Sequence, residues 1–471
     1  MAGFLHGIET LYTNAGGAPI NDIPTCVIGI VGTAPKGPLG PTLITSDVDA
    51  AKVFGTRIRG YTIPYAVDAI FDHGGAAMMI TNVASALAAI APSPKIFVND
   101  KIQVGKKFVS LVTVTNAGAT TTYVPGVDYT LDADEGIITR LSTGAIAAGA
   151  TVAVGYSWAD PALVTPADII GQVTASGART GMQALLNAYG TYGIEPTIII
   201  APGYSPLTSV ATEMTAIGNR LKAGVLIDAP IGATRDQLLA GRASGAAPVG
   251  NFFTSDIRTL LCAPHLKIFD TDTGVDVLEP LSQRVAGVIA RTDTDLGFWY
   301  SPSNKEIAGV VGVERIFETS YTQALSDSNI LNSMGILTYL GVPGGGLRTW
   351  GNRSAAFPAV TTPDNFFVIQ RVRDIIAKGI RRASLQFIDL PINRGLIDAI
   401  RTSILAYLGE KTVQGALLPG SQCLFMAADN PPTAIARGQL TFTTILFPPP
   451  PAERIIDKQV LDIRLASSLV G

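Results

Sequence analysis

The sequence predicts a multidomain protein of mixed α/β class, and three observations support that prediction. Strand-like and helix-like segments alternate in residues 23–94 and again in residues 160–350, which favours a mainly parallel sheet covered by helices. Short runs separated by turn residues fill residues 95–159 between them. The chain has 471 residues, more than a single core normally holds. We therefore expect an α/β core with an inserted small all-β module and an α+β C-terminal domain at residues 351–451.

The first part of the α/β core is predicted from two buried strands with two helices between them. Cys26–Gly32 and Met78–Val83 are continuous apolar runs of the kind found in buried strands. Asp47–Phe54 and Pro64–Asp72 are expected to be helices. Ser46 is a suitable N-cap for the first helix, and the proline can begin the second. Residues 26–83 therefore form an α/β unit in this prediction.

The inserted module is predicted to contain only strands. Its five strand-like runs are Phe108–Thr115, Thr120–Val124, Asp128–Leu131, Gly136–Leu141 and Thr151–Trp158. Turn residues separate them, which is typical of a small all-β unit. Because insertions are tolerated at exposed loops, we expect this module to face outward.

Alternation of strands and helices resumes after Pro161. Pro196–Ala201 and Gly224–Ala229 are strand-like, and Thr208–Ala223 between them has the pattern of an amphipathic helix. Further helices are expected at Thr234–Arg242, Leu278–Arg291 and Asp327–Tyr339. This order predicts parallel strands joined by helical crossovers.

The C-terminal domain is predicted to mix strands and helices. The expected strands are Phe366–Val372, Gln422–Ala427 and Gln439–Phe447, and the expected helices are Asp374–Arg382 and Gly395–Leu408. Pro448–Pro451 then forms a stiff spacer of four prolines.

The two ends of the chain, residues 1–22 and 452–471, are predicted to be extended arms. Beyond the prolines, three alternate residues point to one side of an expected strand: Leu461, Ile463 and Leu465. At the other end the corresponding apolar residues are Phe4, Ile8 and Tyr12. A lone strand must add to an exposed sheet edge. If each end pairs with its own domain the protein stays monomeric, and if each reaches a neighbour the contact repeats into rings or filaments.

Composition favours extensive protein–protein contact. Charged residues make up 15% of the chain and hydrophobic residues 47%, so a lone monomer would expose much neutral surface. The alternative is a large buried core with a Ser/Thr/Gly-rich exterior. A net charge of −3 gives no support for nucleic-acid binding. No apolar run approaches the roughly 20 residues of a membrane-spanning helix, and no secretory signal is visible, so a cytosolic site of synthesis is expected without membrane insertion.

The motifs of common enzymes and cofactor sites are missing from the sequence. It contains no Walker-type loop or nucleophile elbow, and Gly29–Gly32 lacks the third glycine of a dinucleotide loop. The three histidines and three cysteines are too scattered for a metal site. A triad that uses His265 stays open, and Cys26 could pair with a cysteine of a neighbouring chain. We predict no catalytic residue, no cofactor-binding residue and no metal ligand.

One group of basic residues has a candidate role. Arg371, Lys378 and Arg382 fall on one side of a helix, and Arg381 is adjacent to them. They form either a solvated helix face or a surface for an acidic partner.

Three blocks of sequence carry a family resemblance. They are Thr25–Pro38 (TCVIGIVGTAPKGP), Val285–Glu314 (VAGVIARTDTDLGFWYSPSNKEIAGVVGVE) and Leu340–Arg353 (LGVPGGGLRTWGNR). In their order and approximate spacing they resemble the contractile tail sheath proteins of contractile-tailed bacteriophages and related injection particles. Trp299 and Tyr300 within the second block are expected to pack in the core or between domains.

The resemblance implies a structural role without catalysis. It implies a homo-oligomer of stacked hexameric rings in the virion tail, assembled in the host cytoplasm, with the tail tube, baseplate and tail terminator proteins as partners. It also implies that the arms join adjoining subunits and that the C-terminal domain lines the tube. Arg371, Lys378, Arg381 and Arg382 would then be tube-facing. The alternatives are a non-contractile shell or surface-lattice protein and, from another class, an α/β enzyme with a β appendage.

Overall fold

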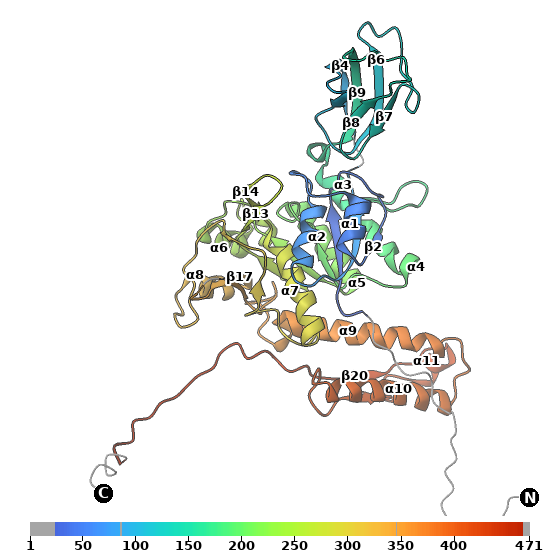
Figure 1. The fold of residues 1–471 in the computed structure, drawn as a ribbon. Coiled ribbons are helices and arrows are strands. Elements are labelled where there is room, and N and C mark those ends of the chain that lie inside the picture. Colours follow the sequence, from blue (N-terminus) through green and yellow to red (C-terminus); the bar gives the residue numbers. More distant parts are fainter. Residues whose placement is uncertain (1–23, 85–86, 345, 465–471) are drawn as a thin grey trace, which may run out of the picture.

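The computed structural model describes residues 24–84, 87–344 and 346–464. Within these ranges the centre of the molecule is a nine-stranded sheet with the strand order β15-β18-β17-β12-β11-β10-β1-β3-β2 (Figure 1). Its strands are β1 (Val27–Gly32), β2 (Thr42–Ile44), β3 (Ala77–Asn82), β10 (Ile198–Ile200), β11 (Gly224–Asp228), β12 (Thr259–Cys262), β15 (Glu306–Ile307), β17 (Ile336–Gly341) and β18 (Leu347–Trp350). The six strands from β17 to β3 run parallel, and the edge strands pair antiparallel. The mixed α/β class is confirmed.

Helices cover both faces of this sheet because its strands are apolar on both sides. Along β1, Val27 and Val31 point into one core, while Ile28 and Ile30 point into the other. The face of Val27 carries α3 (Pro166–Ile170), α4 (Ala188–Tyr192), α5 (Thr208–Leu221), α6 (Arg235–Ser244) and α8 (Asp327–Asn332). The face of Ile28 carries α1 (Asp47–Phe54), α2 (Ile63–Phe71) and α7 (Leu281–Asp295).

Local signals fix several helix ends as expected. The Ser46 hydroxyl accepts a hydrogen bond from the Asp49 amide at 3.1 Å and caps α1. Thr234 and Gln237 form a reciprocal capping box at the start of α6. Shorter 3-10 segments lie at Pro161–Leu163, Gly181–Asn187, Gly250–Phe252, Pro363–Asn365 and Leu385–Phe387. A side sheet of β13 (Leu266–Asp270), β14 (Val275–Glu279) and β16 (Gly312–Val313) borders the core.

The inserted module projects away from the core (Figure 1). It holds two three-stranded sheets, made of β4 (Leu87–Ile96), β9 (Thr151–Ala159) and β6 (Val109–Asn116), and of β5 (Lys101–Gln103), β8 (Ile137–Arg140) and β7 (Tyr129–Asp132). Its apolar residues form a core of their own. Because β4 pairs with β9 along its length, the module begins at residue 87, before the expected residue 95.

The C-terminal domain contains α9 (Phe367–Ser384), α10 (Arg394–Val413), α11 (Pro432–Ala436) and the two-stranded sheet of β19 (Gln422–Leu424) and β20 (Thr443–Ile445). α9 and α10 pack closely where Gly379 faces Tyr407. A Cβ added at Gly379 would lie 2.6 Å from the Tyr407 hydroxyl oxygen. Residues 354–356 still belong to the α/β core, where the Ala355 amide donates to the Thr259 carbonyl. The core therefore extends beyond the expected boundary at residue 350.

Four of the predicted elements differ from the structure in type or in where they begin. Phe366–Val372 is the start of α9 and not a strand, because its apolar residues pack on opposite sides, against the central sheet and against α10. Asp327–Tyr339 splits into α8 and β17, with Gly335 at φ +73° between them. Thr120–Val124 makes one isolated bridge to Thr115, since the Asn116 side chain organises a turn there. The expected helix at Leu278 begins only at Leu281, after strand β14 and Pro280.

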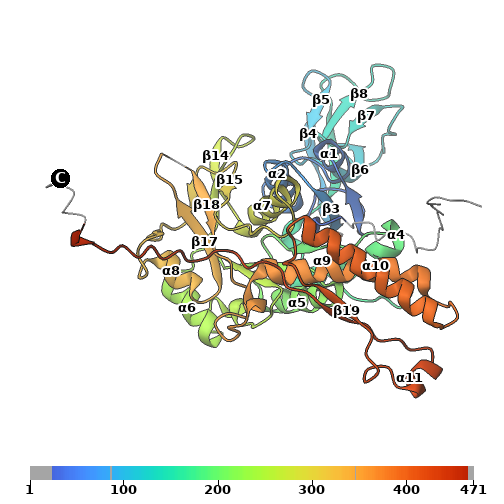
Figure 2. The ribbon, with the colours of Figure 1, turned by 90° about the horizontal axis from the view of Figure 1, so that it is seen from below.

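After Pro448 the chain leaves the body of the molecule and runs outward (Figures 1 and 2). Among the described residues no helix is long and apolar enough to span a membrane.

Candidate functional site

The described part of the C-terminal arm, residues 452–464, carries apolar side chains that no other described residue covers. Leu461 is 97% exposed and Ile463 is 87% exposed, and neither lies in a strand. Ile455, Ile456 and Val460 are exposed as well. Arg353 holds the base of the arm through an ion pair with Glu453. Full burial of such side chains is worth about 1.5–3 kcal/mol each, and the described part of the chain provides none of that burial.

The other expected arm residues cannot be placed. Phe4, Ile8, Tyr12 and Leu465 lie outside the described residues. Their role therefore stays a prediction.

The small sheet of β19 and β20 offers open edges close to the start of the arm. In the described chain each strand pairs only with the other, at Gln422–Ile445, Cys423–Thr444 and Leu424–Thr443. A hollow of about 590 Å³ lies beside β19, between Leu424 and Ile397 of α10. A second, of about 650 Å³, lies beside β20, between Leu446 and Ile369 of α9. An edge strand next to a partly apolar groove is the geometry that accepts an added strand.

Two of the four candidate basic residues are buried inside the chain. Arg371 is 4% exposed, and its guanidinium binds both oxygens of the Asp293 carboxylate, at 3.1 and 2.7 Å. Lys378 is 7% exposed and donates to the Pro196 carbonyl at 3.1 Å. The expectation of an exposed face shared with these two residues is therefore wrong. Arg371 and Lys378 lie on the side of α9 that packs on the α/β core. There each positive group binds an oxygen of the core, the Asp293 carboxylate or the Pro196 carbonyl.

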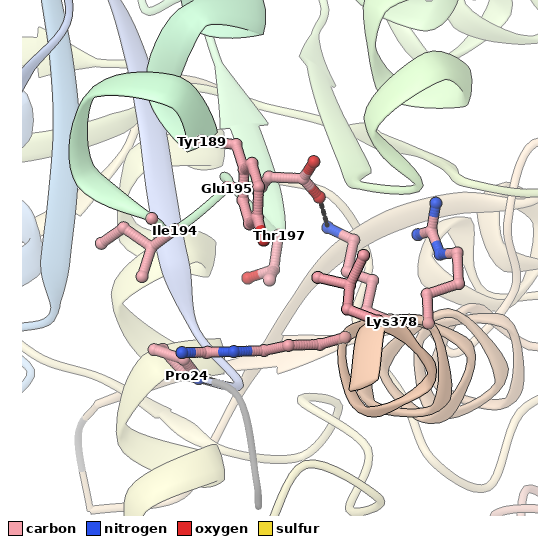
Figure 3. Close-up of a pocket in the computed structure, with 10 residues that line it drawn as sticks. Pro24, Tyr189, Ile194, Glu195, Thr197 and Lys378 are labelled. Atoms are coloured by element: carbon pink, nitrogen blue, oxygen red, sulfur yellow. Dashed lines mark ion pairs between the residues drawn. The ribbon is translucent and has the colours of Figure 1, made fainter. Parts of the chain in front are cut away.

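Arg381 and Arg382 are exposed and lie near the C-terminal end of α9. They border a cavity of about 210 Å³ between this helix and the chain around Pro24 and Glu195 (Figure 3). Within it the Lys378 amine lies 3.7 Å from the Glu195 carboxylate. Burial lowers the pKa of the Lys378 ammonium to about 8, and the charge of Glu195 opposes part of that shift.

A further ion pair and an aromatic contact complete the connection between α9 and the core, which we name the α9 joint. The Arg258 guanidinium binds both oxygens of Asp374, at 2.7 and 2.8 Å. Phe298 lies in the apolar core between α9 and α10, with Trp299 packed against it. Residues of the second sequence block thus fix the C-terminal domain to the core, as was expected of Trp299. Tyr300, which was expected to pack in the same way, is instead 45% exposed. Asp293, Arg258 and Asp374 were not predicted, since partners distant in sequence leave no local pattern.

A buried polar cluster at the end of β11 contains the residues nearest to a possible catalytic triad with His265. The Asp228 carboxylate accepts hydrogen bonds from the Ser205 hydroxyl (2.9 Å), the Ser282 hydroxyl (2.6 Å) and the Ser282 amide (2.8 Å). Both hydroxyls donate to the carboxylate and not to His265, which faces Glu314. Asp228 therefore caps the first turn of α7, and the hydroxyls lack the histidine partner that a nucleophile needs.

Among the described residues no group of His, Cys, Asp and Glu has the arrangement of a metal site. Cys26, Cys262 and Cys423 are free thiols. Burial raises the pKa of the Cys26 thiol far above its usual range, so the reactive thiolate is disfavoured within a single chain.

Comparisons with known proteins agree with the three sequence blocks. Residues 177–355 match a family model described as the phage tail sheath protein central domain, which covers the second block and the third. Residues 76–165 match a family of unknown function. The tail sheath protein of Burkholderia phage BcepMu is 43% identical over 461 residues, or 96% of each chain. The tail sheath protein of Escherichia phage P2 is 24% identical over 471 residues, 100% of this chain and 98% of that one.

Solved structures share the fold at low sequence identity. The sheath complex of the extracellular contractile injection system PVC, in its contracted state, matches with a TM-score of 0.61 and 15% identity, over 99% of each chain. The helical sheath of the anti-feeding prophage, also contracted, has a TM-score of 0.61 and 18% identity over 98% of this chain and all of that one. With the identity to the BcepMu protein along nearly the whole length, these findings confirm the predicted resemblance: the chain belongs to the phage tail sheath protein family.

Proposed function

We propose that this protein is the subunit of a contractile tail sheath and assembles by exchanging extended arms with neighbouring copies. The observation that carries the proposal is the pairing of two incomplete features in one chain. The C-terminal arm exposes Leu461 and Ile463, and the β19–β20 sheet has open edges beside apolar hollows. An extended segment without a sheet and a sheet without a third strand complete each other when the arm of one copy joins the sheet of another.

Arm exchange of this type is head-to-tail. Each subunit both donates an arm and offers an edge, so the contact repeats and produces a ring or a helix. In our proposal the repeat consists of stacked hexameric rings around a tail tube, with baseplate and tail terminator proteins at the two ends. The subunits assemble in the host cytoplasm and function in the virion tail. The exposed Arg381 and Arg382 are our candidates for contact with the tube.

Contraction then needs a subunit that moves as one body. The buried pairs of Arg371 with Asp293 and of Arg258 with Asp374 connect the two domains, which supports a rigid body with motion at the arms. The extended lattice is kinetically trapped in this mechanism, and a baseplate signal releases one ring after another. A difference of about 2.7 kcal/mol per subunit favours one state 99:1, so hundreds of subunits supply the work without a nucleotide.

Electron microscopy of the purified full chain and of a chain that lacks residues 452–471 tests the proposal. We expect hollow, ridged tubes from the full chain and folded, non-assembling subunits from the truncated chain. Ordered tubes from the truncated chain would overturn arm exchange. A lattice of one fixed diameter, with or without a tube inside, would favour the non-contractile shell.

A further inference from the structure

The two edges of the β19–β20 sheet differ, although each lacks a third strand in the described chain. On the β19 side, Arg401 reaches from α10 and its Nε donates to the Cys423 carbonyl at 3.1 Å. Arg401 and Leu424 also line the hollow beside this strand. Among the described residues no side chain forms a hydrogen bond with the backbone of β20 (Thr443–Ile445). A charged side chain therefore caps β19, whereas β20 has no such cap.

The cap on β19 has a cost for any strand that joins there. The Cys423 carbonyl lies at the centre of β19. Charged side chains placed over a strand edge are a common device that prevents the addition of another strand. A third strand at β19 would have to displace Arg401 and lose a charge-assisted hydrogen bond, and a third strand at β20 would not.

The hollow beside β20 suits the apolar side chains of an arm. Ile369, Ile376 and Ile380 line it from α9, and Leu446 lines it from the chain just after β20. The helical spacing of the three isoleucines places them along one face of α9. Two alternate apolar residues of an added strand would pack against that face.

The charges of the same hollow are mostly neutralised within the chain. Its charged lining residues are Arg258, Asp364, Arg373, Asp374 and Arg381. Arg258 is paired with Asp374, and Arg373 is paired with Asp364. An apolar strand can therefore cover the hollow without leaving these four charges unpaired.

We propose that the arm of a second copy adds to β20, and that Arg401 keeps the β19 edge closed to it. The assignment rests on the proposed arm exchange and names the strand that receives the arm. The occupant is another copy, because the chain's own arm runs away from the body after Pro448 (Figures 1 and 2). Leu461 and Ile463 then pack against α9. Each sheet accepts one arm and not two, which keeps the head-to-tail contact unbranched.

Photo-crosslinking tests the assignment without sheath assembly. The receiver is the full chain with Leu461→Asp/Ile463→Asp, which disables its own arm. The probe is a synthetic peptide of residues 452–464 with a short photoreactive residue in place of Asp462, and mass spectrometry locates the adducts. We expect adducts on β20 and few on β19. Arg401→Met in the receiver should raise the share of adducts on β19 about threefold to tenfold, which is the effect of losing one hydrogen bond.

Two controls separate the cap from general effects. Arg394→Met removes a guanidinium from the same hollow as Arg401, and among the described residues Arg394 makes no hydrogen bond with β19, so the adducts should stay on β20. A peptide with Asp in place of both Leu461 and Ile463 should give no specific adduct. Adducts on β19 while Arg401 is present, or a distribution that Arg401→Met leaves unchanged, would overturn the proposal. No adduct on either strand would contradict arm exchange itself, and the receiving strand with it.

Discussion

The α9 joint and the C-terminal arm differ in which kind of side chain they bury. Along α9, charged side chains that sequence patterns place in solvent are buried, as in the pair of Arg371 with Asp293. Along the arm, apolar side chains that belong in a core are exposed, as in Leu461. Each region breaks the ordinary rule of burial in the opposite direction. In α9 the oxygens that bind the buried cations belong to the same chain, whereas no described residue covers the exposed apolar side chains of the arm.

The difference separates the contacts that the chain makes within itself from the apolar surface that it leaves uncovered. A buried charge is tolerated only where its partner is fixed, so the α9 joint is intramolecular and rigid. The exposed apolar residues of the arm would be buried if another chain covered them, as the proposed arm exchange requires. Mutations that act on one region should therefore leave the other intact, and four predictions test this separation.

The largest effect is expected from Leu461→Asp/Ile463→Asp. Together the two side chains contribute roughly 3–6 kcal/mol when buried in a neighbour, so assembly should be lost. The melting temperature of the monomer should stay unchanged, because both side chains are exposed in it. Sedimentation measures assembly and calorimetry measures folding. Asp462→Asn, on the opposite face of the arm, is the matched control and should still assemble. Loss of monomer stability in the double variant would contradict the comparison.

Arg371→Met comes next. It leaves the Asp293 carboxylate buried without its cation and should lower the free energy of unfolding by about 3–5 kcal/mol, measured by urea denaturation. Arg373→Met on the same helix breaks an exposed pair with Asp364 and should cost less than about 1 kcal/mol. Adding Asp293→Leu to Arg371→Met should recover much of the loss. Equal effects of Arg371→Met and Arg373→Met would show that the joint is not buried in solution.

Lys378→Met should change the pH dependence of stability. The pKa of Lys378 is lowered to about 8 in the folded chain from 10.5, so between these values the unfolded chain binds more protons. Wild-type stability should therefore rise relative to Lys378→Met as pH increases from 8 to 10.5, by about 1–3 kcal/mol. Urea denaturation at several pH values measures the difference. A constant difference across this range would mean that the amine is not desolvated.

The smallest effect is expected from Arg381→Glu/Arg382→Glu in tube binding. If these exposed arginines contact an acidic tube, association should weaken severalfold, and the remaining binding should depend less on salt. Co-sedimentation with tube protein at two salt concentrations measures this. Binding that is unaffected by the charge reversal and insensitive to salt would remove the tube-facing role.

Local patterns predicted most of the regular elements of the α/β core. Ser46 gave the start of α1, and the apolar runs at β1 and β11 are buried strands as expected. The errors cluster where a segment is covered on two sides. Phe366–Val372 has apolar residues on more than one face because it packs against both the central sheet and α10, and that pattern imitates a strand.

The candidate site divides in the same way. Leu461 and Ile463 were chosen from the alternation of apolar and polar residues. In the structure both are exposed and lie outside any strand, so their role as arm contacts stays a prediction. Arg371 and Lys378 were found as a group, but their burial was not predicted, because Asp293 and Pro196 approach them from distant parts of the sequence.

The sequence by itself determined the family, the α/β class and the presence of a β insertion, because the patterns of neighbouring residues carry each of them. Only the tertiary structure decided which side of α9 is buried, where the core ends after residue 350, and how Phe298 and Trp299 join the domains. Those features depend on the contact of residues tens to hundreds of positions apart. The free energy of a buried charge or an aromatic ring is set by its partner in space, and a sequence pattern records only the neighbours along the chain.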